Sequence, residues 1–456
     1  MKFLGEYDVI VAGGGMSGVV ASIAAARAGA RTLQAEGSGL IGGLITGGRL
    51  TKPTGVIQPG VYRELVARAA GYGGADAAVQ RSYWGSYTGV FDTEVMQRVV
   101  IEMLDEAKVD VLLFASVTDV LQDGGSVSGV LVQTKEGAQL ATSAVTIDAS
   151  GDGDVAVLAG ADHMIGRPAD GLMQPMTSYF RILGVDFPLL AEDCRRHSDD
   201  VREIVLPDNA GEGNDPYILK FFMTGFGQRI EQARRQGFEW IIPKDTLTMK
   251  AGRLPGEINV NVTRYQGNAL DARVRSRAAL EVRRQAYCAF DFLQRYVGGF
   301  GHAALLDVAP VLGVRETRRI TGDYVLTEAD VLGEARFPDA IGLCNAPVDI
   351  HEPGGVRATM TGVGSGYGIP YRCLLPAGVS GLLLAGRCIS ADHVAFGSTR
   401  NTPACALTAQ AAGTAAAAAA AGRLEPRAVP VAKIQGALGA EGIVLGTEPA
   451  DRLDET

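Results

Sequence analysis

The chain has 456 residues, of which 42 are lysine or arginine and 51 are aspartate or glutamate, so its formal net charge at pH 7 is −9. This acidic balance argues against nucleic acid or an anionic membrane surface as a partner. No apolar run reaches the roughly 20 residues that a membrane span needs, and the six cysteines lack metal-ligand spacing. We therefore expect a cytoplasmic enzyme of two or three domains, with reduced thiols, no metal and no membrane span.

The start of the chain predicts a strand, a glycine-rich turn and a helix. Residues 9–12 form an apolar run, and the glycines that follow have GxGxxG spacing before a helix of small residues. In such a turn, the first glycine permits the tight bend, the second lets a pyrophosphate approach, and the third lets the helix pack on the sheet. The pattern predicts a dinucleotide cradle, although a glycine-rich turn without a ligand is the alternative. The residues that we expect to hold the dinucleotide here are Gly13, Gly15, Met16, Ser17 and Gly18.

A second expected strand, residues 31–35, ends in an acid and a glycine-rich segment. Glu36 stands where a carboxylate can accept hydrogen bonds from ribose hydroxyls, and it disfavours a 2′-phosphate. Residues 37–49 hold six glycines, so their backbone can lie against a flat or phosphorylated ligand. We expect cofactor contacts from Gly42, Gly43 and the hydroxyl of Thr46. A flexible surface loop is the alternative.

The next elements lead back into the same sheet. Asp92 or Thr93 is expected to cap a helix that runs to about residue 108, with an apolar stripe along one side. A strand region follows at residues 109–121, and two strands at 127–134 and 140–147 flank a short turn, which predicts a β-meander.

The middle of the chain has a different pattern. A strand is expected at residues 176–183 and a long helix at 270–297. Acids alternate with the arginines of that helix, so we interpret it as a solvated helix and not as a nucleic-acid surface. This part is expected to be an inserted substrate or cap domain. Arg315 within it either belongs to a paired-charge strand border or binds a substrate anion.

The chain then returns to the first domain. Residues 380–385 predict a buried strand, followed by Gly386 and Arg387. Thr402 is expected at the N-cap of a helix that runs from Pro403 to about residue 421, since proline is favoured in a first turn. Residues 423–445 are expected to contain a short terminal helix.

The two glycine-rich segments together resemble those of a known family. The N-terminal GGGMSG turn and the segment GRCISADHVAFGSTRNTPACALTAQAAG, residues 386–413, resemble the FAD-dependent oxidoreductases of the two-dinucleotide-binding-domain type. The chain looks most like the bacterial "FAD dependent oxidoreductase" family and is distantly similar to succinate dehydrogenase and fumarate reductase flavoprotein subunits. The resemblance implies FAD as cofactor and an α/β fold: a Rossmann-like FAD-binding domain with a β-meander, plus an inserted α+β substrate or cap domain. The expected divisions are residues 1–160, 161–342, 343–422 and 423–456.

The resemblance also implies roles for individual residues. Backbone groups of Val117 would contact adenine, and a DASGDGD-type segment would pass the ribityl and pyrophosphate groups. From that segment we expect contacts at Ser150, Gly151 and Asp152, although aspartate is also a common turn residue. The helix that begins at Pro403 and Ala404 would point its N-terminus at the flavin pyrimidine ring, where helix amides stabilise the negative charge of the reduced flavin. Related proteins often have an acid where this chain has Arg387, after Gly386, so no ribityl-binding acid is expected there.

Candidate catalytic residues come from the return segment. His393 and Arg400 resemble a histidine and an arginine that grip a substrate carboxylate in fumarate reductase relatives. His351 and Tyr371 flank the same strands, and any one histidine could instead be structural. We expect His393, His351 or Tyr371 to act as acid or base and Arg400 to orient the substrate.

The expected function is hydride transfer between a small polar substrate and flavin N5. The alternatives are a non-redox flavin hydratase, isomerase or lyase, a flavin monooxygenase, and an electron-relay subunit. The sequence leaves open the substrate, the electron acceptor, covalent attachment of FAD and assembly into a homo-oligomer.

Overall fold

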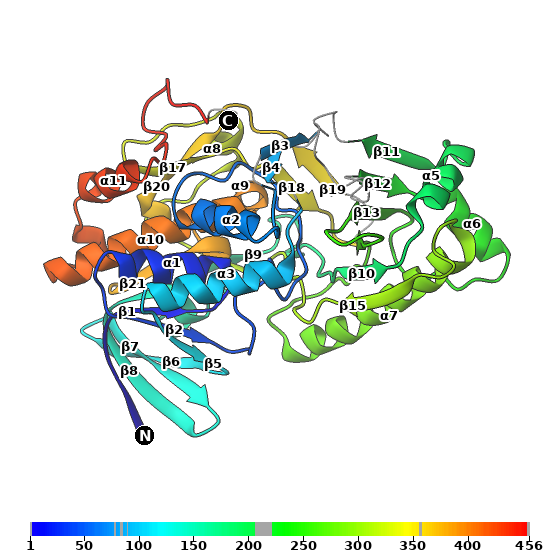
Figure 1. The fold of residues 1–456 in the computed structure, drawn as a ribbon. Helices are drawn as coiled ribbons and strands as arrows, with labels where there is room; N and C mark the ends of the chain where they lie inside the picture. Colours follow the sequence, from blue (N-terminus) through cyan, green and yellow to red (C-terminus); the bar gives the residue numbers. More distant parts are fainter. Residues whose placement is uncertain are drawn as a thin grey trace.

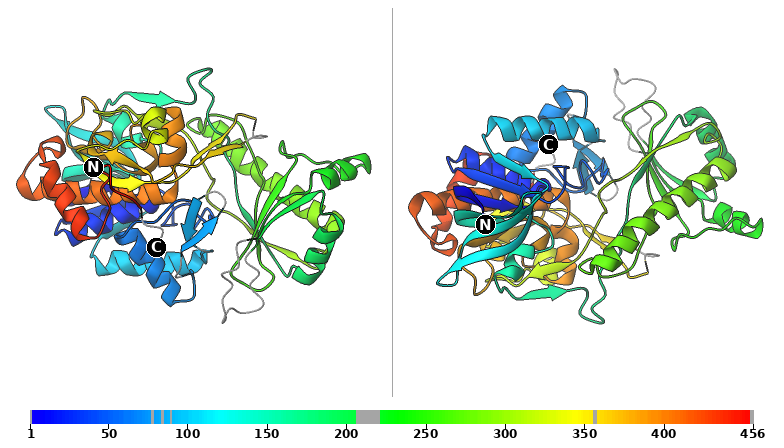
Figure 2. Two further views of the ribbon diagram at one scale, coloured as in Figure 1. Left: turned by 90° about the horizontal axis from the view of Figure 1, so that it is seen from above. Right: turned by 90° about the horizontal axis from the view of Figure 1, so that it is seen from below.

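The computed structural model describes residues 2–76, 79–82, 85–88, 90–205, 221–354 and 358–453. Figure 1 shows two bodies side by side, one of which holds both ends of the chain. We call residues 2–165 and 318–453 the main domain and residues 180–308 the insert. Both views in Figure 2 keep the insert beside the main domain, so the two do not merely overlap in projection.

The main domain is organised around one mixed sheet with strand order β5-β2-β1-β8-β7-β6, in which β21 also pairs with β8. The pairs β5–β2, β2–β1, β1–β8 and β8–β21 are parallel, whereas β6, β7 and β8 form an antiparallel meander. The apolar end of β1 is fully buried, as expected for a parallel strand covered on both faces. The strands are β1 (Lys2–Ala12), β2 (Thr32–Glu36), β5 (Asp110–Leu113), β6 (Ser116–Asp123), β7 (Ser126–Thr134), β8 (Gly137–Asp148) and β21 (Leu382–Leu384).

Small residues let the central helices of the main domain approach closely. A Cβ added at Gly413 of α10 would lie 2.3 Å from the carbonyl oxygen of Ala21 in α1, so these two helices touch backbone to backbone. Among the described helices, α10 is long and apolar enough to cross a membrane by length and composition, but 78% of its apolar window is buried inside the protein. The helices here are α1 (Met16–Arg27), α2 (Val61–Gly71), α3 (Thr93–Glu106), α4 (Asp154–Leu158) and α10 (Thr402–Gly422).

Shorter elements complete the main domain. Small antiparallel sheets form from β3 with β4, β9 with β16, β17 with β20, and β18 with β19. Their strands are β3 (Val79–Ser82), β4 (Gly85–Thr88), β9 (His163–Ile165), β16 (Arg318–Ile320), β17 (Ala340–Cys344), β18 (Val348–His351), β19 (Ala358–Thr361) and β20 (Tyr367–Pro370). The remaining helical elements are α8 (Glu328–Leu332), η1 (Tyr371–Leu374), η2 (Gly386–Cys388), α9 (His393–Thr399), η3 (Pro426–Ala428) and α11 (Val431–Ala440).

The insert is an antiparallel sheet with helices on one face. Its strand order is β11-β12-β13-β14-β10-β15. Apolar side chains of the strands and of α5, α6 and α7 form a separate core that includes Phe226 and Phe292. The strands alternate in character, so the opposite face presents polar residues such as Thr248 and Lys250. The elements are β10 (Phe180–Leu183), α5 (Phe187–Arg196), β11 (Val201–Val205), β12 (Phe221–Gly225), α6 (Gly227–Arg235), β13 (Leu247–Ala251), β14 (Ile258–Asn261), α7 (Ala272–Tyr296) and β15 (Ala304–Val308).

The two chain segments that join insert and main domain meet each other. The backbone N–H of Thr177 donates to the carbonyl of Gly313 at 3.0 Å, and the N–H of Gly313 donates back to Thr177 at 2.8 Å. We call this pair of segments, residues 174–179 and 309–315, the neck. The chain therefore enters and leaves the insert side by side.

The α/β fold class with its meander is confirmed, while several details differ from the sequence-based predictions. The first strand begins at Lys2, before the apolar run at residues 9–12, because its largely exposed start also pairs with β8. Regular pairing in β10 begins at Phe180, since Met176 and Thr177 belong to the neck. The insert sheet spans residues 180–308, a shorter range than 161–342, because β16 and α8 contact η2 and α9 of the main domain.

Candidate active site

The three spaced glycines of the turn between β1 and α1 have different surroundings. Gly13 has a φ of 110°, and a Cβ there would lie 2.5 Å from the carbonyl oxygen of Ala149. A Cβ on Gly18 would lie 1.9 Å from the carbonyl oxygen of Gly13, so α1 packs as closely as the chain allows. By contrast, a Cβ on Gly15 would meet no atom within 4 Å. Protein atoms therefore pack against Gly13 and Gly18, whereas the face of the turn at Gly15 is open, as a ligand cradle requires.

Glu36 lies at the end of β2, directly beside this turn. Its carboxylate accepts hydrogen bonds from the backbone N–H of Gly14 at 2.6 Å and of Ser38 at 2.7 Å. These two bonds fix the acid at the rim of the cradle. Ser116, the first residue of β6, lies beside this segment, because a Cβ on Gly37 would lie 2.7 Å from its hydroxyl, and Val117 is the next residue along the strand. Contact of Glu36 with ribose and of Val117 with adenine remain predictions.

The glycine-rich segment after β2 packs on the turn. The N–H of Gly42 donates to the carbonyl of Gly14 at 2.7 Å, and a Cβ on Gly43 would lie 2.9 Å from the Cα of Gly15. The expectation for Thr46 is wrong in one respect: its hydroxyl is fully buried and donates to the carbonyl of Ile41 at 2.6 Å. A loop this tight uses its hydroxyl to satisfy its own backbone, so Thr46 shapes the loop and has no hydroxyl proton left for a ligand.

Residues 150–152 and 386–387 meet on the other side of the turn. A Cβ on Gly386 would collide with the hydroxyl of Ser17 at the start of α1, which shows how closely the return strand approaches. Arg387 forms an ion pair with Asp152 and donates to the hydroxyl of Thr317 at 2.9 Å. Burial alone would raise the pKa of Asp152, but Arg387 with other donors holds that pKa below its usual value. The arginine at this position therefore neutralises a buried acid.

Nearby small residues support this arrangement. The hydroxyl of Ser150 donates to Asp148 at 2.6 Å and accepts from the N–H of Asp154 at 3.1 Å. A Cβ on Gly151 would lie 3.0 Å from the guanidinium of Arg387, so a larger residue there would press on the ion pair. The direct cofactor contacts predicted for residues 150–152, Gly386 and Arg387 remain predictions.

The N-terminus of α10 is open. Its N-cap is Asn401 and not Thr402, and the Asn401 side chain makes no capping bond. Its amide instead donates to the carbonyls of Pro347 and Gly397, at 3.2 and 3.1 Å, which ties α10 to α9 and β18. The backbone amides of the first turn, including Ala404 beyond Pro403, therefore have no side-chain partner. Such a helix end attracts negative charge.

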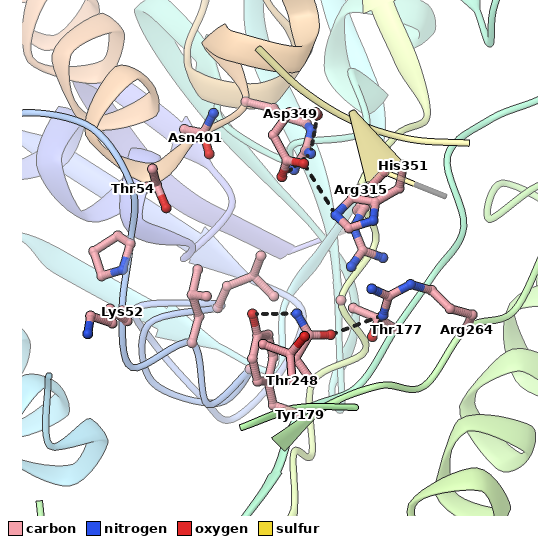
Figure 3. Close-up of a pocket in the computed structure, with 18 of the residues that line it drawn as sticks. Lys52, Thr54, Thr177, Tyr179, Thr248, Arg264, Arg315, Asp349, His351 and Asn401 are labelled. Atoms are coloured by element: carbon pink, nitrogen blue, oxygen red, sulfur yellow. Dashed lines mark hydrogen bonds and ion pairs between the residues drawn. The ribbon is translucent and has the colours of Figure 1, made fainter. Parts of the chain in front are cut away.

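A cavity of about 800 Å³ lies between the main domain and the insert. Residues 44–54, the start of α10 and β18 bound it on the main-domain side, and the polar face of the insert sheet bounds the other side. Figure 3 shows Asn401 on the side of α10 and Arg264 on the side of the insert strands. The acidic residues lining this cavity are Asp349 and Glu352. The basic ones are Lys52, Lys244, Lys250, Arg264, Arg315, Arg387 and Arg400.

Three of the lining residues form a polar cluster. Arg400 donates to the carboxylate of Asp349 at 2.9 Å and to its backbone carbonyl at 2.5 Å. Nε2 of His351 lies 3.4 Å from the other carboxylate oxygen of Asp349 (Figure 3). Burial would raise the pKa of Asp349, but Arg400 and His351 hold it well below the usual value. Burial, together with the charge of Arg315, lowers the pKa of His351 to about 3, so its imidazole is neutral.

Comparison with known families decides the class of the protein. Residues 8–438 match the model of a family described as FAD dependent oxidoreductase. The chain belongs to this family. FAD is its cofactor.

Solved structures with a similar fold are more distant. One is a geranylgeranyl bacteriochlorophyll reductase-like protein from Thermoplasma acidophilum, with 12% identity, a TM-score of 0.46, and coverage of 96% of this chain and 84% of that one. A second is p-nitrophenol 4-monooxygenase from Pseudomonas putida, with 12% identity, a TM-score of 0.44, and coverage of 99% and 91%. A third is the myxobacterial chondrochloren halogenase, with 13% identity, a TM-score of 0.41, and coverage of 99% and 87%.

The residues of this FAD dependent oxidoreductase fit the cofactor. The open face at Gly15 leaves room for a pyrophosphate where a side chain would fill the space, and the first-turn amides of α1 have no side-chain cap. The uncapped start of α10 borders the cavity, where its amides suit the charge of a reduced flavin ring. When bound, FAD supplies the acceptor for a hydride, which is two electrons and one proton, at N5.

The structure brings together only some of the predicted catalytic residues. Arg400 and His351 meet at the cavity, but His393 is not among the described residues that line it. Nδ1 of His393 lies 3.1 Å from Glu316, which also binds the N–H of Gln174 and the guanidinium of Arg319. His393, the first residue of α9, is thus part of a hydrogen-bonded network with Glu316 and Arg319.

The expectation for Tyr371 as acid or base is wrong. Its ring is buried in η1, its hydroxyl donates to the carbonyl of Pro426 at 3.0 Å, and burial raises its pKa well above the usual value. The described lining of the cavity does not include it.

The sequence-based prediction missed the acid that joins Arg400 and His351 at the cavity. Asp349 stands two positions before His351 in β18, and this alternation in a strand places both side chains on one face. That pattern could have revealed Asp349. Lys244 and Arg264 carry no local pattern that marks them, because tertiary structure alone brings them to the cavity.

Proposed function

We propose that this FAD dependent oxidoreductase transfers a hydride between a small polar substrate and the flavin. The observation that carries the proposal is the position of the cavity: the open N-terminus of α10 and Arg387 border one side, and the polar insert face borders the other. A substrate between these walls would have one end at the cofactor and the other end among polar side chains. Such placement is the protein's main contribution to flavin chemistry.

Arg400 is proposed to orient the substrate. Its guanidinium is held by both the carboxylate and the carbonyl of Asp349, so it does not need to be ordered at the moment of binding. Its Nε is buried and has no hydrogen-bond partner among the described residues, which leaves one donor in need of an acceptor. A polar oxygen of the substrate would supply that acceptor.

His351 is proposed to move the proton that accompanies hydride transfer. The ionised carboxylate of Asp349 beside Nε2 favours a hydrogen on that nitrogen, which leaves Nδ1 as the proton acceptor. In the ligand-free protein the cationic surroundings keep the pKa of His351 low. A negatively charged substrate would offset this field and raise the pKa, so the imidazole becomes a better base when the site is filled.

Anaerobic mixing tests this function. FAD-loaded protein is mixed without oxygen with polar alcohols, amines and acids, and the visible flavin band is followed. Bleaching by one substrate class, slowed about 10²-fold or more in His351→Gln with full FAD content, supports hydride transfer with a proton acceptor at His351. Arg277→Gln, a change on the exposed side of α7, serves as the control.

Two other outcomes would overturn the proposal. Turnover without any change in flavin oxidation state would identify a hydratase, isomerase or lyase. Hydroxylation that consumes a nicotinamide reductant and oxygen, with no anaerobic bleaching by the substrate, would identify a monooxygenase.

A further inference from the structure

Arg264 is a buried cation without an acidic partner. It follows β14 and is only 2% exposed. Its guanidinium donates to three neutral oxygens, those of the Thr177 hydroxyl at 3.2 Å, the Asn261 amide at 3.0 Å and the Thr263 carbonyl at 2.7 Å. Among the described residues no carboxylate lies within ion-pair distance, and its Nε is buried with no hydrogen-bond partner. Burial lowers the pKa of Arg264 to about 10, and the nearby Tyr179 and Asp349 offset this effect only in part.

Arg315 and Lys244 line the same end of the cavity and share this property. Arg315 is 8% exposed, and its guanidinium donates to the carbonyl of Pro175 at 2.6 Å. The ammonium of half-buried Lys244 makes neither a hydrogen bond nor an ion pair in the part of the chain that the structure describes. Burial and the charges of Arg264 and Arg315 lower the pKa of Lys244 to about 7. The charges of Arg264 and Arg315 therefore act on Lys244, and Asp349, which already pairs with Arg400, offsets the charges of the two arginines only in part.

Other buried arginines of this protein are paired. Arg319 binds Glu316, and Arg229 binds Asp193 and Asp200. Burying a charge is unfavourable unless a counter-charge and hydrogen bonds compensate it. A cluster that lacks this compensation and faces a cavity is matched to a ligand that brings the negative charge.

We propose that Arg264, Arg315 and Lys244 form a subsite for an oxyanion group of the substrate, a carboxylate or a phosphate. The inference rests on the proposed function: it places the anionic end of the substrate against the insert and the reacting carbon toward Asn401 and the start of α10. Figure 3 shows Arg264 and Arg315 on the side of the cavity away from Asn401. Planar guanidinium donors and a mobile ammonium together match the oxygens of such a group.

The subsite also explains a feature of the polar cluster. The charge of Arg315 is one cause of the low pKa of His351. An oxyanion at Arg315 would offset that charge, so the same group that anchors the substrate would prepare the imidazole to accept a proton.

Calorimetric titration of the FAD-loaded protein tests the inference without turnover. Succinate, inorganic phosphate and the neutral succinamide are titrated at constant ionic strength set with sodium chloride. We expect at least one of the two oxyanions to bind and succinamide not to bind. Binding of succinate alone would show that the subsite takes a carboxylate, and binding of phosphate alone would show that it takes a phosphate. Binding of both would show that it recognises oxyanions in general.

Substitutions locate the binding. Lys244→Gln removes no side-chain hydrogen bond or ion pair among the described residues, so it is expected to fold as the parent does, and it should weaken binding at least about tenfold. Arg264→Gln should weaken binding by at least as much. Arg277→Gln removes the same charge from the exposed side of α7 and should leave affinity within about twofold, as expected for a screened surface charge.

Absence of binding by both oxyanions, or equal affinity in Lys244→Gln and Arg277→Gln, would overturn the subsite. The two proposals fail separately. Oxyanion binding without anaerobic bleaching by any substrate would support the subsite and contradict the hydride-transfer function. Bleaching by a neutral substrate together with no oxyanion binding would support hydride transfer and contradict the subsite.

Discussion

The cofactor end and the proposed substrate end of the site are formed by different kinds of chemical group. The cofactor end uses backbone: glycines at the β1–α1 turn, the uncapped amides of α1 and α10, and close contacts such as that of Gly386 with Ser17. The substrate end uses long charged side chains from separate segments, such as Lys244, Arg264 and Arg315. From this comparison we expect shape to decide recognition at the first end and charge to decide it at the second. Substitutions at the two ends should therefore change different measurements.

The largest effect is expected at the cofactor end from Gly15→Val. The added Cβ meets no protein atom within 4 Å, so the chain should fold, but the side chain would occupy the space expected for the pyrophosphate. Purified protein should be colourless while its circular dichroism is unchanged. Gly71→Ala, at another position where a Cβ meets nothing within 4 Å, should remain yellow. Retention of FAD by Gly15→Val would show that shape at the turn does not decide binding.

Arg400→Ala is expected to affect turnover without affecting FAD binding. The protein should keep FAD and lose turnover, since the orienting guanidinium is gone. Removing one partner of a buried pair leaves the carboxylate of Asp349 without its main counter-charge, at a cost of about 3 kcal/mol or more in the free energy of unfolding.

The double variant Arg400→Ala/Asp349→Asn provides the control. It should recover part of the lost stability in denaturant titrations, but not the turnover. A colourless Arg400→Ala protein would move this residue from substrate to cofactor binding.

The pH dependence of oxyanion binding should be smaller and should come from Lys244. Its pKa in the ligand-free protein is about 7, and a bound anion raises that pKa, so binding takes up a proton. Affinity for succinate should therefore fall as the pH rises above 7, by up to about tenfold per unit. The facing Arg264 stays protonated in this range and His351 stays neutral. The slope should disappear in Lys244→Gln, measured by calorimetry between pH 7 and about pH 8.5. An unchanged slope would contradict this assignment.

Tyr371→Phe should have the smallest effect. The substitution leaves the buried carbonyl of Pro426 without its donor, so the free energy of unfolding should fall by about 1 kcal/mol in denaturant titrations. Turnover and FAD content should remain those of the parent. A tenfold slower turnover at unchanged stability would restore Tyr371 as a catalytic candidate.

The parts of the fold that could be predicted are those with local patterns. The spaced glycines between two apolar strands, the meander around residues 135–137 and the proline in the first turn of α10 all act within a few residues. Errors occurred where one local pattern competed with another. Asn401 and not Thr402 takes the N-cap, and the hydroxyl of Thr46 bonds to its own loop.

The site could be predicted only in part, for the same physical reason. Arg400 and His351 lie in segments that return to the main domain beside the start of α10, so their position along the chain was informative. The position of His393 was misleading, because α9 directs its ring to Glu316. Lys244 and Arg264 reach the cavity through the pairing of β13 with β14 and the packing of the insert, which are long-range contacts. No sequence window contains such information.

The neck has a consequence for how such proteins diversify. Because Thr177 and Gly313 hydrogen-bond to each other in both directions, the chain crosses from the main domain and back at one place. Another sheet beyond that crossing would leave the glycine turn and the start of α10 in place and would replace insert contacts such as the ion pair of Arg275 with Asp152. Exchange of the segment between residues 177 and 313 would therefore give the cavity a different wall opposite α10, while the main domain keeps its own sheet.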